Sequence, residues 1–366
     1  MPHEPMTNYS TLVLAKVRQE NVLKTGVIFN NDYEGDAASG LVRIPVRDTE
    51  VEVSDYDKAN GIKGKTSSTT YENFVINRDK AVNEIIDGFD AQSVPDNLVA
   101  DRLDSAGYSI ARAEDIDGAA VLLAGAVVLN VDSLDETNIY SRIVDLRTAL
   151  SKKNIPNDNK RYLLVTPDVY ALVLKCPEFI KASDLGDSVV QTGAVGRIAG
   201  FNVYEWNDST PGFRMLAGHP RFATRAEAFK KDIHIQDLGG SGEYIGASAV
   251  QGRLVYDHKV LRKEAFIALY SPAALEVALA KGAANGTTIA TITGGDGTYY
   301  YKVNPSARAV YDQTTKAYGG AELASGTTEI TASEGDVIEV VSITGGKVTA
   351  AGYIEVRKNN VAVVEG

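Results

Sequence analysis

The chain has 366 residues, of which 37 are Lys or Arg and 48 are Asp or Glu, and its formal net charge is −11 at pH 7. A chain of this length can bury a large core and form two domains, so it needs neither disulfides nor metals for stability. The acidic balance and the lack of any block of basic residues argue against a protein that reads specific nucleic-acid sequences.

Two further features narrow the class. The single cysteine, Cys176, permits no intramolecular disulfide and fits a reducing compartment, and its place beside Pro177 is typical of a small core residue. No run approaches the roughly 18 apolar residues of a transmembrane helix. The stretch from Met1 to Tyr9 has neither the basic start nor the apolar centre of an export signal.

The first expected element is a long hairpin that begins near Gly40. Two alternating arms, Leu41 to Val53 and Thr66 to Val75, flank a polar tip between Asp55 and Lys65. Such a hairpin has little core of its own and exposes strand edges, a liability unless a neighbouring subunit covers them. The tip is superficially like a calcium loop, but its glycine comes one position late, so a solvated turn is the better interpretation.

The residues from Val94 to Val128 predict a long helix. Pro95 and Asp96 suit a helix start, and the opposite face of the helix is charged. Apolar residues recur every three or four positions, less strictly toward the end: Val99, Leu103, Ala106, Ile110, Ile116, Ala120 and Leu123. A break at Gly107 or Gly118 remains an alternative, because glycine weakens a helix interior.

A second helix, a strand and a third helix are expected next. The stretch from Ser133 to Leu150 is amphipathic, with one apolar face made by Ile139, Ile143, Leu146 and Leu150. The run from Tyr162 to Val165 suits a short buried strand. Thr166-Pro167-Asp168 then supplies an N-cap oxygen, an N1 proline and a first-turn acid for a helix that ends before Pro177.

Strands dominate the following region. Gly193, Gly196 and Gly200 separate two runs, Val195 to Ala199 and Phe201 to Trp206, which predicts a hairpin. Three more strands are expected at Ala226 to Ile235, Glu243 to Gly252 and Leu254 to Tyr270.

The last part of the chain has a different character. Gly282 to Gly286 (GAANG) is expected to be a linker into an all-β unit rich in Thr, Gly, Val and Ile. Candidate strands are Thr287 to Thr293, Thr298 to Val303, Thr327 to Ala332, Val337 to Thr344 and Gly352 to Arg357. Its core is expected from Tyr299, Tyr301, Ile338, Val340 and Ile354.

The motifs of catalysis and cofactor binding are not found in the sequence. The four histidines (His3, His219, His234 and His258) include no pair at the i, i+4 spacing of a helical zinc site. The GGSG turn at Gly239 to Gly242 lacks the lysine of a phosphate-binding loop, and no G-x-S-x-G elbow places a nucleophile. We therefore expect no enzyme, no metal, no cofactor and no catalytic residue.

The order of parts from Lys160 to Trp206 carries a family resemblance. The phrase LLVTPDVYALVL, followed about two dozen residues on by GAVGRIAGFNVY, resembles the major capsid proteins of tailed bacteriophages that share the HK97-type shell fold. The resemblance implies an α+β fold with an N-terminal arm (1–39), an E-loop (40–75) and P- and A-domains (76–282). Within the latter, the helix at about 94–128 resembles the family's spine helix, and KEAFIALYSPAALEVAL the closing strand of the P-domain. Residues 286–366 resemble an Ig-like module.

The resemblance also implies a function and partners. The chain is expected to self-assemble into pentamers and hexamers of an icosahedral head, made in the bacterial host cytoplasm, that packages double-stranded DNA non-specifically. A portal is implied, and the short stretch before Gly40, with an initiator-like Met1, favours a separate scaffolding protein. Contacts between subunits are expected on the E-loop, from Arg43, Arg47, Lys58, Lys63 and Lys65.

Some relatives cross-link an E-loop lysine to an asparagine, but no matching asparagine or glutamate motif is found here. Lysines at a polar loop tip ordinarily serve as solubilising charge. Two other functions stay open. One is an encapsulin-like nanocompartment shell, which shares the fold but encloses enzymes. The other is an adhesin or carbohydrate-binding protein that uses the β-rich tail, against which the lack of an export signal and of exposed aromatics other than tyrosine weighs.

Overall fold

The computed structural model describes residues 16, 18, 21–23, 26–33, 40–47, 50–62, 64, 66, 68–93, 98–176, 196–208, 210–240, 242 and 244–362. These residues fold into two compact units. Unit 1 is drawn from Met1–Ala124 and Pro220–Arg262, and unit 2 from Gly125–His219 and Lys263–Gly366. Few helices and many strands confirm the α+β class.

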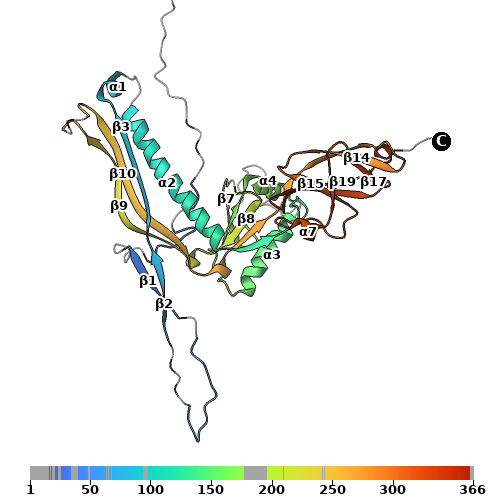
Figure 1. Cartoon of the computed structure of the whole chain (residues 1–366). Helices are drawn as coiled ribbons and strands as arrows, with labels where there is room; N and C mark the ends of the chain where they lie inside the picture. Colours follow the sequence, from blue (N-terminus) through green and yellow to red (C-terminus); the bar gives the residue numbers. More distant parts are fainter. Residues whose placement is uncertain are drawn as a thin grey trace, which may run out of the picture. The chain divides into compact units, whose positions relative to one another are not determined.

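The body of unit 1 is one helix on one sheet (Figure 1). The sheet is antiparallel in the order β3 (Arg78–Ile86), β10 (Ser248–Val260), β9 (Ala223–Asp237). The helix α2 (Leu98–Gly125) lies along it. Two short helices, α1 (Gly88–Ser93) and the 3-10 helix η2 (Pro220–Phe222), complete the unit. Strand β3 was not predicted from the sequence, and β10 replaces parts of two separately predicted strands.

The long predicted helix is confirmed as α2, without a break, but it ends at Gly125 rather than Val128, because Val127 and Val128 belong to a strand, β4 (Val127–Asn130). Residues 94–97 lie outside the described residues. Ala106 packs with Ile86 and Val250, so the first half of the predicted apolar stripe is correct. The second half is wrong: Ile116 is exposed, and the buried positions are Asp115, Gly118, Ala119 and Leu122. Gly118 leaves room for neighbours, since a Cβ there would lie 3.1 Å from the ring of Phe29 and 3.2 Å from Nε2 of His258.

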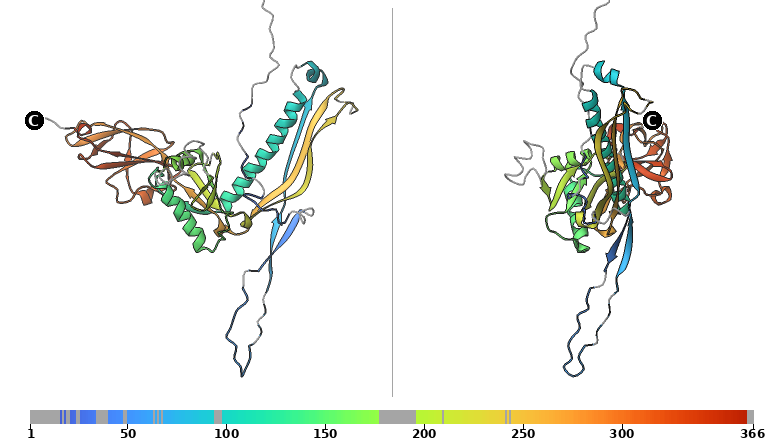
Figure 2. Two further views of the ribbon diagram at one scale, coloured as in Figure 1. Left: turned by 180° about the vertical axis from the view of Figure 1, so that it is seen from behind. Right: turned by 90° about the vertical axis from the view of Figure 1, so that its left-hand side faces the viewer.

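The predicted hairpin is present but paired over a shorter length. Strand β1 (Leu41–Val46) pairs antiparallel with β2 (Thr70–Val75), in the register Leu41↔Val75 to Val46↔Thr70. One face packs against Ala226 through Val42, Ile44, Phe74 and Ile76. Between the strands lies the hairpin loop, residues 47–69, whose described residues form no strand and extend away from the sheet of unit 1 (Figures 1 and 2).

Unit 2 contains a six-stranded sheet with helices beside it. The order is β4 (Val127–Asn130), β11 (Ile267–Tyr270), β8 (Phe213–Gly218), β5 (Tyr162–Val165), β7 (Phe201–Glu205), β6 (Arg197–Ile198). The helices are α3 (Ile139–Lys152), α4 (Pro167–Lys175) and the 3-10 helix η3 (Lys263–Ala265).

Most expectations for this region are confirmed. The four apolar residues predicted for one face of α3 are fully buried, and Cys176 is buried at the end of α4. The antiparallel pair β6–β7 is the described part of the predicted hairpin, while Gly193 to Val195 lie outside the described residues. The N-cap expectation is wrong in one respect: α4 follows Thr166, but the Thr166 side chain makes no capping bond.

The segment KEAFIALYSPAALEVAL, expected to be the closing strand of the P-domain, forms three separate strands instead. Within it, β11 pairs in parallel with β4 and antiparallel with β8, in the six-stranded sheet rather than beside β3, β10 or β9. Its continuation forms β12 (Ala273–Ala274) and β13 (Glu276–Lys281), which pair with strands of the C-terminal region.

The C-terminal region of unit 2 consists of two sheets. One has the order β12, β19 (Lys347–Glu355), β18 (Val337–Thr344), β15 (Thr298–Val303), β16 (Ala321–Leu323), and the other β13, β14 (Thr287–Thr293), β17 (Glu329–Thr331). The short helices are α7 (Thr315–Tyr318) and η4 (Lys358–Asn360). The five predicted core residues all contribute to one apolar cluster.

The predicted linker is wrong. Gly282 to Gly286 form the turn between β13 and β14, which pair from Glu276↔Thr293 to Lys281↔Thr288. The carboxylate of Glu329 accepts hydrogen bonds from the amides of Ala283 (2.9 Å) and Ala284 (3.3 Å) and so holds this turn in place. The C-terminal sheets therefore begin before the glycines.

Candidate subunit interface

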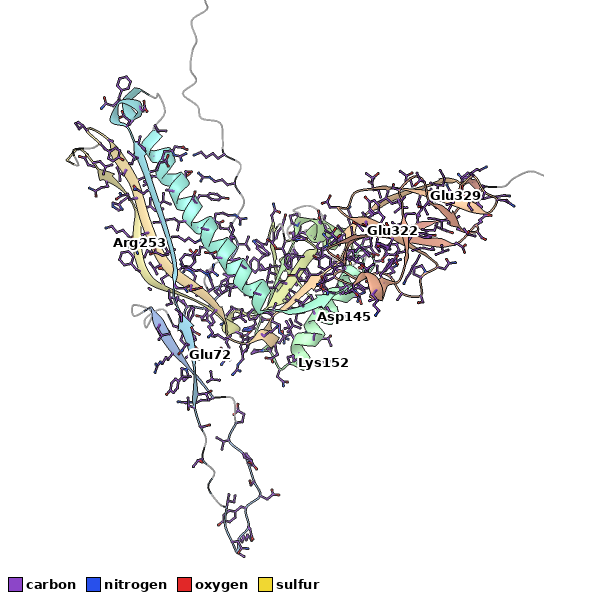
Figure 3. The ribbon with its side chains drawn as sticks, viewed as in Figure 1. Glu72, Asp145, Lys152, Arg253, Glu322 and Glu329 are labelled. Carbon is purple, nitrogen blue, oxygen red and sulfur yellow. The ribbon has the colours of Figure 1, made fainter. Side chains whose placement is uncertain are left out.

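The base of the β1–β2 hairpin is firmly attached to unit 1. Besides the apolar contacts with Ala226, Nζ of Lys259 donates to the carbonyl of Asn73 (2.7 Å) and lies 3.3 Å from the carboxylate of Glu72. Figure 3 shows Glu72 on this hairpin. The base therefore fixes the direction in which the hairpin loop leaves the sheet.

The hairpin loop itself presents apolar side chains that the described residues leave uncovered. Val51 is 89% exposed and Val53 is 94% exposed, and Tyr56 and Ile62 are exposed as well. Single exposed apolar residues are common on protein surfaces, but several on one unsupported loop indicate a surface that a partner covers.

The tip of the loop is a self-contained turn. The carboxylate of Asp57 accepts hydrogen bonds from the amide of Ala59 (2.8 Å) and the side-chain amide of Asn60 (2.6 Å). These bonds hold the pKa of Asp57 below its ordinary value. The turn closes with Gly61 at a positive φ of 65°. Among the described residues, no group of three or more His, Cys, Asp or Glu side chains that could hold a metal ion occurs.

The basic residues predicted for subunit contacts are spread along the hairpin. Arg43 is exposed on β1 opposite Asn73, and Lys58 is exposed in the turn at the tip. Arg47 lines a groove of about 440 Å³ at the hairpin base, together with Tyr33, Glu72 and Arg262. Lys63 and Lys65 lie outside the described residues. The structure does not gather these cations into one site, and their role in contacts stays a prediction.

A second apolar surface, which was not predicted from the sequence, lies at the end of the unit 1 sheet. The start of α1 touches the β9–β10 turn, since a Cβ on Gly88 would lie only 2.0 Å from the carbonyl oxygen of Gly246. Next to these glycines, Phe89 is 79% exposed and Ile245 is 84% exposed. Phe89 follows Asp87-Gly88 and Ile245 follows Tyr244 in a turn, so neither belongs to a periodic apolar pattern that would have revealed it.

Charges along α2 are paired within the subunit. Lys16 binds Asp101 (2.6 Å) and Arg18 binds Asp104 (2.7 Å). Further along, the buried carboxylate of Asp115 accepts the amides of Val22 (3.1 Å) and Leu23 (2.9 Å). The described N-terminal residues therefore follow the helix from Asp101 to Asp115.

A groove of about 300 Å³ between α2 and the sheet contains the other notable charges. Arg225 is ion-paired with both Glu114 and Glu227, and burial raises the pKa of Glu114. The same groove is lined by Lys230 and Asp232, whose Nζ and Oδ1 atoms lie 3.5 Å apart, so acids and bases alternate along it.

Comparison with known proteins decides what this combination of parts is. A model of the family described as phage capsid protein matches residues 83–267, just over half of the chain. The chain belongs to the phage capsid protein family. The match runs from within β3, through α2, α3 and α4, to the first residue of β11, and thus covers most of the helix-on-sheet body of unit 1 and most of the six-stranded sheet of unit 2.

Solved structures give the same fold at low sequence identity. That of Mycobacterium phage Che8 matches with a TM-score of 0.61 and 20% identity, covering 72% of this chain and 96% of that chain. The capsid of the cyanophage P-SCSP1u matches with a TM-score of 0.60 and 12% identity, covering 73% of this chain and 92% of that chain. The capsid of a native GTA particle matches with a TM-score of 0.53 and 14% identity, covering 74% of this chain and 95% of that chain. No curated protein matches the chain.

The predicted HK97-type shell fold is thereby confirmed. This capsid protein is a major capsid protein, a structural subunit of the icosahedral phage head, and its place is in the virion. Among the described residues no helix is long and apolar enough to cross a membrane.

Proposed function

We propose that copies of this capsid protein assemble into pentamers and hexamers in which the hairpin loop of each subunit lies across its neighbour. The observation that supports this most is the exposure of Val51 and Val53 on a loop that the described residues of its own subunit leave bare. Burying such residues against a second copy removes apolar surface from water, and thousands of repeated contacts make a stable wall from individually weak ones.

The charged residues of the hairpin suit assembly that can correct itself. Exposed ion pairs each contribute little, so Arg43, Arg47 and Lys58 would set the register between subunits rather than the total affinity. Weak polar contacts dissociate readily, which lets misplaced subunits leave before the shell closes.

The proposal is tested by deleting Ser54–Lys65, which removes the tip and keeps the β1–β2 base. The deleted subunit should fold, as judged by circular dichroism and thermal unfolding, but should give no closed shells in electron microscopy and sediment as small species. Replacing Lys316, an exposed lysine far from the hairpin in sequence, by Ala is the control and should leave particles intact. Normal particles from the deletion would disprove the role of the loop.

The same particles test the contents of the shell. We propose that the interior holds double-stranded DNA without sequence preference, since the net charge of −11 offers no basic groove and avoids trapping a genome that must be released. A separate scaffolding protein and a portal complete the proposed assembly. Particles that contain protein cargo instead of DNA would favour the nanocompartment function.

We also propose that the chain performs no catalysis.

The C-terminal sheets are proposed to form an Ig-like module that begins near Ala273. The matched structures leave roughly a quarter of this chain uncovered, although they are themselves covered almost completely. A region of that size agrees with the strands from β12 to β19. The remaining division proposed is an N-terminal arm up to residue 39, an E-loop at 40–75 and P- and A-domains after it.

A further inference from the structure

The strand β4 is an edge strand without charged residues. All four of its residues are exposed, and the central Val128 is 55% exposed, although the strand reads VVLN and carries no charge. It lies at one end of the six-stranded sheet, where β11 is its single neighbour. A neutral, apolar, open edge is the kind of strand to which another chain adds.

The backbone of β4 has hydrogen-bonding groups available on the open side. The amide of Val127 donates to the carbonyl of Phe266 (2.8 Å), and the amide of Val131 donates to the carbonyl of Tyr270 (2.9 Å). In a parallel pair alternate residues face the partner strand, so the amides and carbonyls of Val128 and Asn130 point away from β11.

The two edges of the unit 1 sheet are built differently. The edge strand β3 carries Asp79, Lys80 and Glu84, and β9 carries Lys230, Lys231 and Asp232. Charged residues on an edge oppose the addition of a further strand. The contrast within one chain indicates that β4 is kept free of charge because it is covered in the assembled state.

We propose that the segment Glu50–Ser54 of a second copy adds to β4 as a further strand. This rests on the proposed function, because it names the surface that the hairpin loop of a neighbour covers. Val51 and Val53 are β-branched and two positions apart, so in an added strand both lie on one face, beside Val127 and Leu129. Glu52 then lies on the other face, between Val128 and Asn130, where the Asn130 amide can donate to its carboxylate.

Both surfaces are incomplete in the same way. The loop segment belongs to no strand, and β4 has half of its backbone groups directed outward. Because every copy carries both surfaces, each subunit can give its loop to one neighbour and receive one from another. Such a head-to-tail contact generates rings when the rotation closes, as pentamers and hexamers require.

Cysteine cross-linking tests the contact directly, since residues opposite each other on adjacent strands are close enough for a disulfide. The natural Cys176 is buried, so the wild type should give no cross-linked product. Subunits with Glu52→Cys and Val128→Cys should form a ladder of covalent oligomers under mild oxidation. The matched pair Glu52→Cys and Lys80→Cys, which tests the charged β3 edge instead, should remain monomeric on a denaturing gel.

The inference would be overturned if the β3 pair gave a ladder, or if neither pair gave cross-linked oligomers. Two single variants, Glu52→Cys and Val128→Cys, mixed as unassembled subunits at high concentration should also give a covalent dimer. This arm decides the inference even when no shells form, whereas the absence of shells from wild-type protein counts against the proposed function.

A charge on the edge gives an independent result. Val128→Lys should fold normally, because the side chain is already exposed, but should lower particle yield at least tenfold. Lys230→Glu on the β9 edge is the control and should keep the yield within twofold of wild type. Wild-type yield from Val128→Lys would contradict strand addition at β4.

Discussion

His258 on β10 is a buried histidine that stays neutral. Its ring centroid lies 4.6 Å from that of Phe29 and 5.6 Å from that of Tyr256. Burial lowers the pKa of His258 to about 3. The positive charges of Arg225 and Arg78 reinforce this shift, and the negative charge of Asp117 opposes it. In the unfolded chain the same side chain has its ordinary pKa near 6.5.

This difference makes the subunit sensitive to acid. Below about pH 6.5 the unfolded chain binds a proton that the native subunit does not accept until about pH 3, so stability is lost as pH falls through that window. Between pH 6.5 and 4.5 the loss from this residue should be about 2–3 kcal/mol. Urea unfolding of unassembled subunits at several pH values measures it.

His258→Gln should flatten that pH dependence by a comparable amount, whatever it does to stability at pH 7. The matched control is His234→Gln on β9, which removes a histidine without opening the core. Equal pH slopes for wild type and His258→Gln would contradict the assignment of a neutral buried imidazole.

At the scale of single elements, α2 contains two glycines with opposite surroundings. A Cβ on Gly107 would meet Cδ1 of Ile233 at 3.8 Å, an ordinary contact, whereas one on Gly118 would crowd the rings of Phe29 and His258. Gly107→Ala should therefore raise the free energy of unfolding by about 0.5–1 kcal/mol through helix propensity alone. Gly118→Ala should gain nothing or lose stability, because the rings must move. Thermal unfolding of the two variants compares them, and equal gains would contradict this account of α2.

The turn between β13 and β14 depends on a distant carboxylate. Glu329 also accepts the hydroxyl of Thr287 (3.1 Å), and its three hydrogen bonds hold its pKa below the ordinary value. Glu329→Ala should speed amide exchange and protease cleavage at residues 282–286. Glu322→Ala, which removes another exposed glutamate of the same region (Figure 3), should change neither rate. Unchanged exchange in Glu329→Ala would show that the turn holds without this carboxylate.

These elements also show what the sequence could reveal. The buried faces of α3 and α2 were predictable where apolar residues follow the helical period. The prediction failed at Ile116, because the neighbouring Asp115 is buried instead and accepts hydrogen bonds from backbone amides. The GAANG turn was mistaken for a linker because glycine is common in both turns and linkers. Glu329, whose carboxylate holds the turn, is more than 40 residues away in the sequence. Strand β3 was missed because the charged residues Arg78, Lys80 and Glu84 occupy its half-buried positions, so apolar and polar residues do not alternate along it.

The proposed contact surfaces were less predictable than the fold. The hairpin was found from its alternating arms, but the exposure of Val51 and Val53 depends on what the rest of the subunit fails to cover. Likewise, VVLN looks in sequence like a buried strand, and its place at a sheet edge follows from tertiary pairing with β11. Local pattern specifies elements, whereas an interface is defined by what remains unpaired after folding.

At the scale of the whole subunit, the C-terminal sheets are attached to the six-stranded sheet of unit 2 rather than tethered to it. The ring of Tyr311 stacks on Tyr270 with centroids 5.6 Å apart, and its hydroxyl donates to the carbonyl of Pro211 (2.8 Å). Gly212 makes room for this ring, because a Cβ there would lie 2.1 Å from it. The two parts should therefore unfold together.

The single tryptophan, Trp206, makes that expectation measurable. It is buried beside Phe213 of the six-stranded sheet, so its fluorescence reports on that sheet, while circular dichroism reports on all strands. In wild type the two signals should give one coincident denaturation curve. Tyr311→Ala should lower stability by about 1–3 kcal/mol and separate the curves, because it removes both the stacked ring and the hydrogen bond. Tyr311→Phe keeps the ring and should cost about 1 kcal/mol with the curves still coincident. Separate transitions in the wild type, or a Trp206 transition that Tyr311→Ala does not move, would show instead that the C-terminal sheets are an independent appendage of the shell subunit.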